Sequence, residues 1–548
     1  MQIRLPLNAS LCFQLFNQDV RTPSRLLAES NGVRCNCCGH CHLRPDLTIY
    51  RLFFHPLAKI PGPKLCAITG WYEIFWDVFV GGQFTFKVEE WHKKYGIDLS
   101  CPSALRSLTE AGPIMRIGPN EVHFNDPDFY NELYPTIGAT YEKPAQWRWR
   151  FGCGTAIFDT VGHDHHAQRK APVAAFFSRQ KILQFSSFIQ DQTNILVQRI
   201  RDDHKGQVIC ANEAFDALTM DIIGYYAFGL SYNSIQYPRF KAPYRNVTAD
   251  IARMVHVGAH FPCVFKILNA LPEKYITKLL PPMSKIFMFR KEISSQIRRI
   301  KDNKEYLDKN VNEHRTVFHE ILNSSQPACE LNEGRIYHEA LSLVGAALET
   351  SKRTTALAVY YILATPGVEA NLRAELAAAM PDKAKILSVP ELESLPYLNA
   401  VIKEALRLAI GVSQRMRRYS PTETITYKDY TIPPNTVFAM CHWEQLCDAR
   451  IWDRPTEFLP ERWLGEQPLA LNGQPLIKYF VPFHRGPRMC LGKEFGMAQL
   501  NIGLATLLRQ DDIKLELYET DREDVDVVAD FFVPLTVKES QGVRVLVK

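Results

Sequence analysis

One cysteine near the C-terminal end of the chain has a setting suited to binding a metal. Cys490 follows a loop that contains Gly486 and Pro487, and an apolar run at helical spacing begins just after it, from Phe495 to Leu507. The start of a helix presents unpaired backbone N–H groups and the positive end of the helix dipole, and both favour an anion. We therefore expect Cys490 to be a thiolate that binds iron.

The residues around this cysteine suit a flat ligand. Gly486 permits a tight loop, and Gly492 lets a ligand lie close to the backbone, because glycine has no Cβ. Phe483 would shield the sulfur from water. The spacing Phe-x-x-Gly-x-Arg-x-Cys-x-Gly, in which the arginine is Arg488, resembles the haem-binding loop of the cytochrome P450 family. The alternative is a buried, unreactive cysteine at the start of a helix.

A second candidate group lies in a long apolar-periodic run over 335–364, which as a helix would be about 45 Å long. Glu349 and Thr350 are adjacent in its middle, where a buried carboxylate is costly unless it has a partner or a function. The stretch Ala346 to Ser351 resembles the central-helix motif of the same family. That resemblance implies that Thr350 orders water beside the oxygen on iron and that Glu349 supplies protons. An ordinary core helix with one partnered glutamate is the alternative.

The same stretch departs from the family pattern at one position. Ala347 stands where the family usually has a second glycine. Alanine favours a regular helix more than glycine does, so we expect a narrower or less distorted opening for dioxygen.

A third group would stabilise the fold. Glu404 and Arg407 are three residues apart, so they share a helix face within ion-pair reach. Arg462 lies in a segment, Phe458 to Trp463, that precedes the cysteine loop. The resemblance implies a structural network of Glu404, Arg407 and Arg462, in which guanidinium groups bind the carboxylate in a bidentate manner.

A haem also carries two propionates, which need fixed cations. The resemblance assigns this role to His166, Lys170, Arg417 and Arg488. His166 and Lys170 are four residues apart on one helix face, where the family usually has tryptophan and arginine. Each of these residues alone would more often be a solvated surface group. A metal-binding cluster with His163 and His165 is a rival interpretation, but no glutamate or cysteine completes it at ligand spacing.

Composition excludes some classes of protein. The 548 residues are 46% hydrophobic, enough for a large core. A net charge of +5, with lysine and arginine scattered along the chain, argues against a nucleic-acid partner. Most of the 14 cysteines are isolated in the sequence, which is typical of a reducing compartment.

Periodicity predicts a mainly helical fold with a small β portion. We expect helices at about 163–203, 211–229, 249–270, 283–307, 334–364, 367–379 and 397–409. We expect short strands at 115–124, with a turn at Pro119-Asn120, and within 423–427, 436–441 and 527–547. The resemblance implies one domain over 49–548 with the cytochrome P450 fold, in which haem lies between the long helix and the cysteine loop.

Two segments fall outside this pattern. Residues 1–48 contain no run of ~20 apolar residues that could span a membrane, and no signal peptide, so we interpret them as an atypical leader or as a start that differs from the natural protein. The run Cys35 to His42 could bind zinc and contact a partner, although its spacing lacks separated cysteine pairs. Residues 97–111 interrupt the resemblance and are interpreted as an insertion. We expect both segments to be dispensable to the core.

The function implied by the resemblance is that of a haem b monooxygenase with Cys490 as the axial ligand. It would insert one atom of O2 into an apolar small molecule, a terpenoid or polyketide intermediate of fungal secondary metabolism. No glycine-rich phosphate loop follows the cysteine, so electrons should come from a separate NADPH-dependent flavoprotein reductase. The alternative is a haem-thiolate binding or sensor protein without turnover.

The resemblance also implies a location on the cytosolic face of the endoplasmic reticulum membrane. Any attachment should be peripheral, through apolar residues after the segment Pro61 to Pro63. The candidates are Trp71, Phe75, Trp76 and Phe79.

Overall fold

The computed structural model describes residues 44–95, 112–138, 140–280, 283–302, 316–382 and 386–548. The prediction for the zinc-binding run Cys35 to His42 lies outside the described residues, and so does the predicted insertion at 97–111. The leader was expected to extend to residue 48, but a first helix, α2 (Pro45–Ile49), already begins within it.

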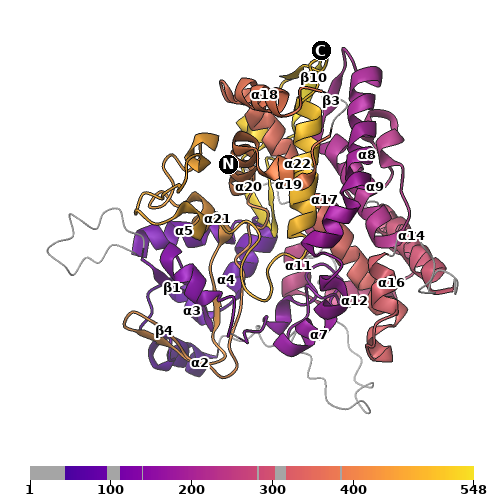
Figure 1. Ribbon diagram of the computed structural model, residues 1–548. Helices are drawn as coiled ribbons and strands as arrows, with labels where there is room; N and C mark the ends of the chain where they lie inside the picture. The colour runs from indigo at the N-terminus through magenta and orange to yellow at the C-terminus, as the bar shows by residue number, and fades with distance from the viewer. Residues whose placement is uncertain (1–43, 96–111, 139, 281–282, 303–315, 383–385) are drawn as a thin grey trace.

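Helices dominate the molecule (Figure 1), as the periodicity predicted. In the first half of the chain they are α3 (Lys64–Ile68), α4 (Trp71–Ile74), α5 (Phe84–Tyr95), α6 (Tyr130–Leu133), α7 (His163–Ala174), α8 (Arg179–Asp203), α9 (Ala211–Phe228), α10 (Val247–Ala252), α11 (Val255–His260), α12 (Cys263–Ala270) and α13 (Glu273–Leu279). In the second half they are α14 (Met283–Asp302), α16 (Val317–Leu322), α17 (Glu333–Ala364), α18 (Val368–Ala379), α19 (Val389–Glu393), α20 (Pro396–Ala409), α21 (His442–Cys447) and α22 (Lys493–Leu508).

The long helix α17 has the boundaries that its sequence dictates. Its first turn is capped by Asn332, whose side chain accepts a hydrogen bond from the backbone N–H of Arg335. No proline interrupts it until Pro366, just beyond its end. The helix packs against α9, α14, α20 and α22. It therefore forms the central axis of the helical part.

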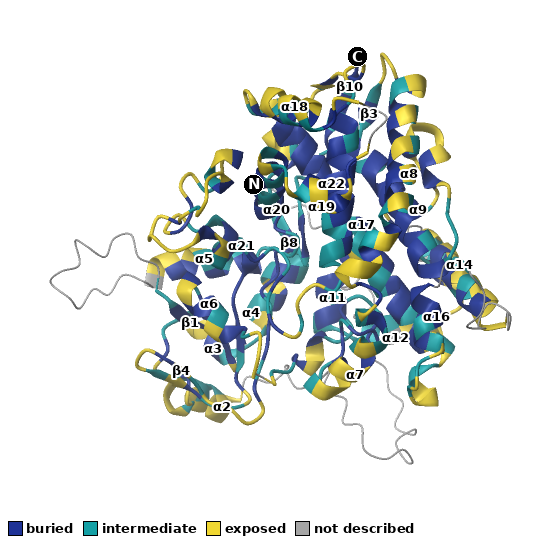
Figure 2. Ribbon diagram, in the orientation of Figure 1, coloured by how far each residue is buried: buried dark blue, intermediate teal, exposed yellow. Residues whose placement is uncertain are grey.

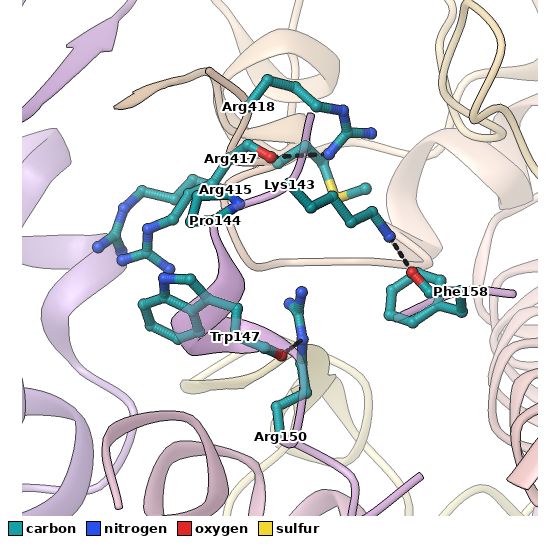
Figure 3. Close-up of a pocket in the computed structure, with 9 residues that line it drawn as sticks. Lys143, Pro144, Trp147, Arg150, Phe158, Arg415, Arg417 and Arg418 are labelled. Atoms are coloured by element: carbon teal, nitrogen blue, oxygen red, sulfur yellow. Dashed lines mark hydrogen bonds between the residues drawn. The ribbon is translucent and has the colours of Figure 1, made fainter. Parts of the chain in front are cut away.

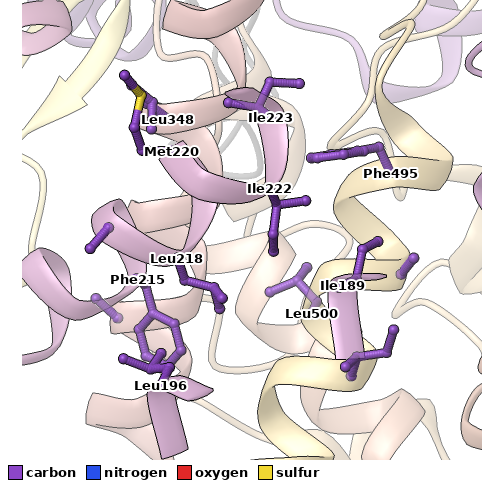
Figure 4. Packing of buried hydrophobic residues seen from close by; sticks show 14 of the residues in the cluster. Ile189, Leu196, Phe215, Leu218, Met220, Ile222, Ile223, Leu348, Phe495 and Leu500 are labelled. Atoms are coloured by element: carbon purple, nitrogen blue, oxygen red, sulfur yellow. The ribbon is translucent and has the colours of Figure 1, made fainter. Parts of the chain in front are cut away.

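The core lies between these helices. Side chains of α8, α9, α17 and α22 interlock there (Figure 4), among them Ile189, Phe215, Leu348 and Leu500. Burial is concentrated on the inner faces of the helices, while exposed residues lie on their outer faces (Figure 2). Because α22 is buried on most of its surface, the cysteine loop before it is held against the centre of the molecule.

Two predicted helices are divided in the structure. The run 163–203 is broken between α7 and α8, where Phe176 and Phe177 turn into the core. The run 249–270 becomes α10, α11 and α12, and Pro262 at the start of α12 prevents a continuous helix. Periodicity alone does not reveal such breaks, because the apolar spacing continues across them.

The β portion consists of four small sheets in the described part of the chain. The first contains β1 (Ile114–Gly118), β2 (Glu121–Phe124) and β6 (Val437–Ala439), with β1 and β2 antiparallel as the turn at Pro119-Asn120 predicted, and with β2 and β6 parallel. The others pair β3 (Val208–Cys210) and β7 (Leu515–Leu517) with β10 (Arg544–Val547), β4 (Ile425–Tyr427) with β5 (Tyr430–Ile432), and β8 (Ala529–Phe531) with β9 (Val533–Leu535).

None of the helices in the described ranges combines the length and the apolar character needed to cross a bilayer. Large apolar side chains are nevertheless exposed near the N-terminal end of the described chain. Phe53 and Phe54 are 71% and 72% exposed, and Leu65, Trp71 and Phe75 are also exposed. Of the four residues predicted for membrane contact, Trp71 and Phe75 are exposed, whereas Trp76 and Phe79 are partly buried.

Candidate functional site

Cys490 ends a tightly folded loop directly before α22. Its backbone N–H donates to the carbonyl of Phe483 at 2.9 Å, and Met489 N–H donates to the carbonyl of Gly486 at 3.0 Å. Gly486 has a φ of +78°, and a Cβ there would lie 2.8 Å from the carbonyl oxygen of Pro135. Glycine is therefore required at this position, for the left-handed backbone and for the close approach.

Cys490 is a more exposed residue than the cysteines of the core. Cys490 is exposed, whereas Cys66, Cys153 and Cys441 are buried. A Cβ added to Gly492 would meet no atom within 4 Å, so a flat group could approach this side of the loop. These observations argue against a buried, unreactive cysteine and fit a ligand of haem iron.

The protein surroundings do not by themselves make Cys490 a thiolate. Although the residue is exposed by its accessible surface, the protein atoms packed around the loop desolvate its thiol and raise the pKa, while the backbone N–H of Gly492 and the ammonium of Lys170 act in the opposite direction. The helix start thus contributes the stabilisation expected from the sequence, but desolvation outweighs it. A coordinated metal ion would complete the deprotonation.

The middle of α17 has one open face. Ala346 is exposed and Thr350 is half-buried, although Val344 and Leu348 beside them are buried. The Thr350 hydroxyl donates to the carbonyl of Ala346 at 2.7 Å, which leaves its oxygen able to accept a hydrogen bond. Thr350 is therefore available to order a water molecule or a ligand group.

Glu349 points into a different environment. Its Oε1 accepts a hydrogen bond from the Thr248 hydroxyl at 2.5 Å and lies 2.9 Å from Nζ of Lys352. Lys352 also lies 3.5 Å from Asp216. Glu349 is thus a partnered carboxylate that joins α17 to α10, which fits the structural alternative as well as a proton relay.

The structural network predicted around Glu404 is brought together. Arg407 binds its carboxylate at 2.7 and 3.0 Å, and Arg462 Nε lies 3.1 Å from Oε1. The indole N–H of Trp463 adds a further hydrogen bond at 2.9 Å. Glu404 and Arg407 are fully buried, and together with Arg462 they tie α20 to η10 (Pro460–Trp463).

Arg488 and Lys170 lie next to the cysteine loop. Arg488 donates to the carbonyls of Thr160, Val161 and Gly162 at 2.6 to 3.1 Å, but its buried Nε has no hydrogen-bond partner among the described residues. Lys170 donates to the carbonyl of Pro487 at 2.9 Å. In the described ranges both side chains bond to backbone carbonyls rather than to carboxylates, so their charges remain available to an anionic ligand.

His166 is buried beside them and is not a cation. Burial and the neighbouring Arg488 lower its pKa to about 2. It can therefore offer a neutral N–H to a propionate but no positive charge, which weakens its predicted role as one of four cations.

Arg417 already has carboxylate partners within the protein. Its guanidinium binds Glu73 and Glu121, the latter at 2.8 Å, and stacks on the ring of Trp147. Arg415 contacts the same two carboxylates at 2.5 and 2.9 Å. The charge of Arg417 is thus already neutralised within the protein, contrary to the role predicted for it.

Arg418, the next residue, fits the role predicted for Arg417 better. Neighbouring residues in extended backbone point to opposite sides, and Figure 3 shows the side chain of Arg418 turned away from Trp147, on whose ring Arg417 stacks. Arg418 is 4% exposed and has no carboxylate partner in the described part of the chain; it donates to the carbonyl of Arg417 at 2.8 Å and to Nε2 of His484 at 3.2 Å. A spacing of ten residues from Arg407 could not distinguish the two arginines.

Lys143 is a second cation that the sequence reasoning missed. It lines a small pocket with Arg150, Arg418 and the ring of Phe158, and donates to the carbonyl of Phe158 (Figure 3). Burial, with Arg418 and Arg488 nearby, lowers the pKa of Lys143 well below its ordinary value. The lowered pKa shows that several cationic groups repel one another in this buried place, and an anion bound there would relieve the repulsion.

A hydrogen-bonded chain connects Arg418 to the cysteine loop. His484 is buried within the loop, and its Nδ1 lies 2.5 Å from the hydroxyl of Tyr130, which in turn lies 3.0 Å from Nε2 of His442. Burial and Arg418 hold the pKa of His484 well below its ordinary value, so the ring is a neutral acceptor for Arg418. These contacts come from residues far apart in the chain, so no local pattern could predict them.

Comparison with known proteins agrees with this geometry. The family model "Cytochrome P450" matches residues 110–527. A protein of Eupenicillium brefeldianum named "Cytochrome P450 monooxygenase orf3" is 91% identical over 502 residues, which are 92% of this chain and 95% of that protein. "Fusicoccadiene C-8 hydroxylase" of Phomopsis amygdali is 35% identical over 91% of this chain and 93% of its own length. The crystal structure of the cytochrome P450DA heme domain superposes with a TM-score of 0.65 at 16% identity, over 89% of this chain and 97% of that chain.

Proposed function

Because this chain belongs to the cytochrome P450 family and is a cytochrome P450 monooxygenase with the fold of that family, we propose that it holds haem b through Cys490 and oxidises an apolar small molecule of fungal secondary metabolism. The observation that carries the proposal is the exposed Cys490 beside cationic side chains that have no carboxylate partner in the part of the chain that the structure describes. When bound, the haem supplies the activation of O2 with two external electrons.

The cations near the loop would hold the two propionates. Arg418, Arg488, Lys143 and Lys170 provide hydrogen-bond donors, and Nε of Arg488 is buried without a partner among the described residues. Guanidinium groups suit a carboxylate because they donate two parallel hydrogen bonds. Arg417 contributes indirectly, by fixing the segment that carries Arg418.

The open face of α17 would adjoin the substrate and O2. The Thr350 hydroxyl directs its own proton to Ala346 and accepts a hydrogen bond from a water molecule, which it holds in place as a proton donor. Glu349 accepts a hydrogen bond from Thr248 and pairs with Lys352. A proton that Glu349 supplies must therefore reach it through these two partners.

The source of electrons is proposed to be an NADPH-dependent flavoprotein reductase. The support is the family match, because a cytochrome P450 monooxygenase needs two electrons from an external donor. Reconstitution with a microsomal reductase tests this: NADPH should be consumed only when reductase, chain and substrate are all present. Haem-loaded protein that consumes no NADPH with reductase and substrate present would favour the sensor alternative.

The substrate is proposed to be a terpenoid or polyketide skeleton. The support is the 35% identity with a protein whose name states hydroxylation of fusicoccadiene. Expression of this chain beside the biosynthetic enzymes encoded next to it, with mass spectrometry of extracts, tests the substrate class. A product heavier by one oxygen atom is expected from an apolar precursor, and an unchanged extract in the presence of spectrally intact protein would contradict the proposal.

We also propose attachment to the cytosolic face of the endoplasmic reticulum membrane. The support is the exposed group of Phe53, Phe54, Leu65, Trp71 and Phe75, which lies within a short stretch of sequence. Clustered exposed aromatic side chains are typical of surfaces that insert into the interfacial layer of a bilayer.

A further inference from the structure

Three buried side chains converge at a point outside the region assigned to haem. Asp77 lies in η3 (Phe75–Phe79), and His256 and His260 lie one turn apart on α11. Oδ2 of Asp77 is 3.3 Å from Nδ1 of His256 and 3.8 Å from Nε2 of His260, and all three atoms lie within 4.8 Å of one another. Asp77 and His256 are 2% and 1% exposed, and the side chain of His260 is 10% exposed.

The three atoms that face one another make no hydrogen bond with the described part of the chain. Buried polar atoms are seldom left in this state, because each one loses its hydration. The second polar atom of Asp77 and that of His256 do have hydrogen-bond partners. Asp77 Oδ1 accepts from the backbone N–H of Phe84 at 3.3 Å, and His256 Nε2 contacts the carbonyl of Asp530 at 2.5 Å.

The Asp530 contact determines which nitrogen of His256 carries a proton. A backbone carbonyl can only accept a hydrogen bond, so Nε2 of His256 is the donor and carries the proton. In the neutral ring Nδ1 then carries a lone pair and no proton. This atom lies 3.3 Å from the anionic oxygen Oδ2 of Asp77. Two electron-rich atoms at this separation repel each other unless a proton or a metal ion lies between them.

We propose that Asp77, His256 and His260 bind a zinc ion. Two imidazole nitrogens and one carboxylate oxygen are common zinc ligands, and a fourth position open to water would lie on the side of His260, the most exposed of the three. Tetrahedral zinc with bonds of about 2.0–2.1 Å separates its ligand atoms by about 3.3 Å, close to the 3.3 and 3.8 Å found here. A zinc-bound histidine usually donates its other ring N–H to a carbonyl or carboxylate, which fixes the ring orientation. The Asp530 carbonyl would do this for His256.

A shared proton is the competing explanation. Burial alone lowers the pKa of His256, but the Asp77 carboxylate raises it to about 9, so an imidazolium could neutralise that contact. A proton satisfies one pair of atoms only, and the 3.8 Å between Asp77 and His260 is too long for a hydrogen bond. A metal ion engages all three atoms at once.

A second buried group, His92, His123 and Glu444, differs in this respect. Nε2 of His92 and Nδ1 of His123 lie 2.8 Å apart and form a hydrogen bond with each other. That contact already satisfies two of the ring nitrogens, so the case for a metal there is weaker.

A zinc ion at the first group would fasten together distant parts of the chain. It would join η3 to α11, and through His256 to Asp530 at the β8–β9 hairpin. Asp530 is itself bound by the hydroxyls of Thr85 and Ser413 at 2.5 and 2.8 Å. The zinc ion would therefore stabilise the position of α11 relative to the N-terminal helices.

The test uses the full-length holoprotein, stripped with a chelator, equilibrated with zinc and passed through a desalting column. Zinc and iron per chain are measured by elemental analysis, and the zinc ligands by X-ray absorption at the zinc edge, to which haem iron does not contribute. Nitrogen and oxygen neighbours at about 2.0–2.1 Å report this site, whereas sulfur at about 2.3 Å would report the N-terminal cysteines.

We expect the wild type to hold one zinc more per chain than His260→Gln or Asp77→Asn, with zinc affinity at the site lowered at least about 100-fold in both variants. His163→Gln, which changes a histidine outside the site, should keep the wild-type zinc content. The iron content should stay equal in all of them, which shows that each is folded. Equal zinc in the wild type and His260→Gln, or a zinc shell made of sulfur alone, would overturn the proposal.

Discussion

A substitution at Thr350 should affect the reaction without affecting the fold. Its hydroxyl lies on the open face of α17 and its proton is directed to Ala346. We expect Thr350→Ala to keep its haem content, since the remaining methyl group fills most of the space. Product formed per NADPH consumed should fall about 10-fold or more, with the lost electrons recovered as hydrogen peroxide, because an ordered proton donor is missing.

Thr354→Ala is the matched control for this change. Thr354 lies one helical turn further on and makes the same kind of hydrogen bond, from its hydroxyl to the carbonyl of Thr350 at 2.8 Å, but it is buried. Its loss should leave coupling unchanged. Full coupling in Thr350→Ala at normal haem content would show that Thr350 does not face oxygen.

Arg417 and Arg418 form a pair of neighbours with opposite expected effects. Arg418→Ala should release haem to an excess of apomyoglobin at least about 10-fold faster, since a charge-assisted hydrogen bond contributes roughly 1.5–3 kcal/mol. Arg417→Ala should lower the melting temperature, because it leaves Glu73 and Glu121 with Arg415 alone. Its haem release should change much less. The reverse pattern would restore Arg417 as the propionate ligand.

Gly486 tests the folding of the loop itself. Gly486→Ala combines a φ of +78° with a Cβ 2.8 Å from a backbone oxygen, whereas Gly367→Ala has a φ of +82° and meets nothing within 4 Å. The two share the conformational cost, so chemical denaturation should find Gly486→Ala less stable than Gly367→Ala by about 1–3 kcal/mol, the cost of overpacking. Equal stabilities would mean that the loop shifts away from Pro135.

At the scale of elements, helix α5 and strand β1 lie on either side of the predicted insertion at 97–111. The N–H of Gly112 donates to the carbonyl of His92 at 2.9 Å, so the described chain on either side of 96–111 is held together. Replacing 97–111 by a short glycine-serine linker should therefore leave haem content and melting temperature unchanged. Loss of folded haem protein on this replacement would show that the segment is an integral element.

The elements also show what the sequence can predict. Apolar periodicity and turn residues are local properties of the sequence. They predict the long helix α17, the β1–β2 hairpin and the helix α22 that follows the cysteine loop. The breaks within 163–203 and 249–270 depend on which side chains the core accepts. The choice of Arg418 over Arg417 depends on strand orientation, and the contacts of His484 with Tyr130 and Arg418 depend on tertiary packing, so neither is encoded in any short window of sequence.

At the scale of the whole molecule, the exposed apolar residues near the N-terminal end predict the mode of membrane binding. A protein held only by such side chains should be released from microsomes by carbonate washing. Replacing Phe53 and Phe54 by serine should reduce sedimentation with microsomes, whereas the same change at Leu469 and Leu471, also exposed but far away in sequence, should not. Resistance of the wild type to carbonate would indicate a spanning anchor instead.

The central claim is that Cys490 is the thiolate ligand of a haem, and the absorption spectrum of the reduced carbon monoxide complex tests it most directly. The wild type should show the long-wavelength Soret band that thiolate ligation produces. Cys490→Ser should lose that band, while Cys441→Ser, which changes a buried cysteine, should retain it. A thiolate band that persists in Cys490→Ser, or that is missing from haem-loaded wild type, would contradict the assignment of this site.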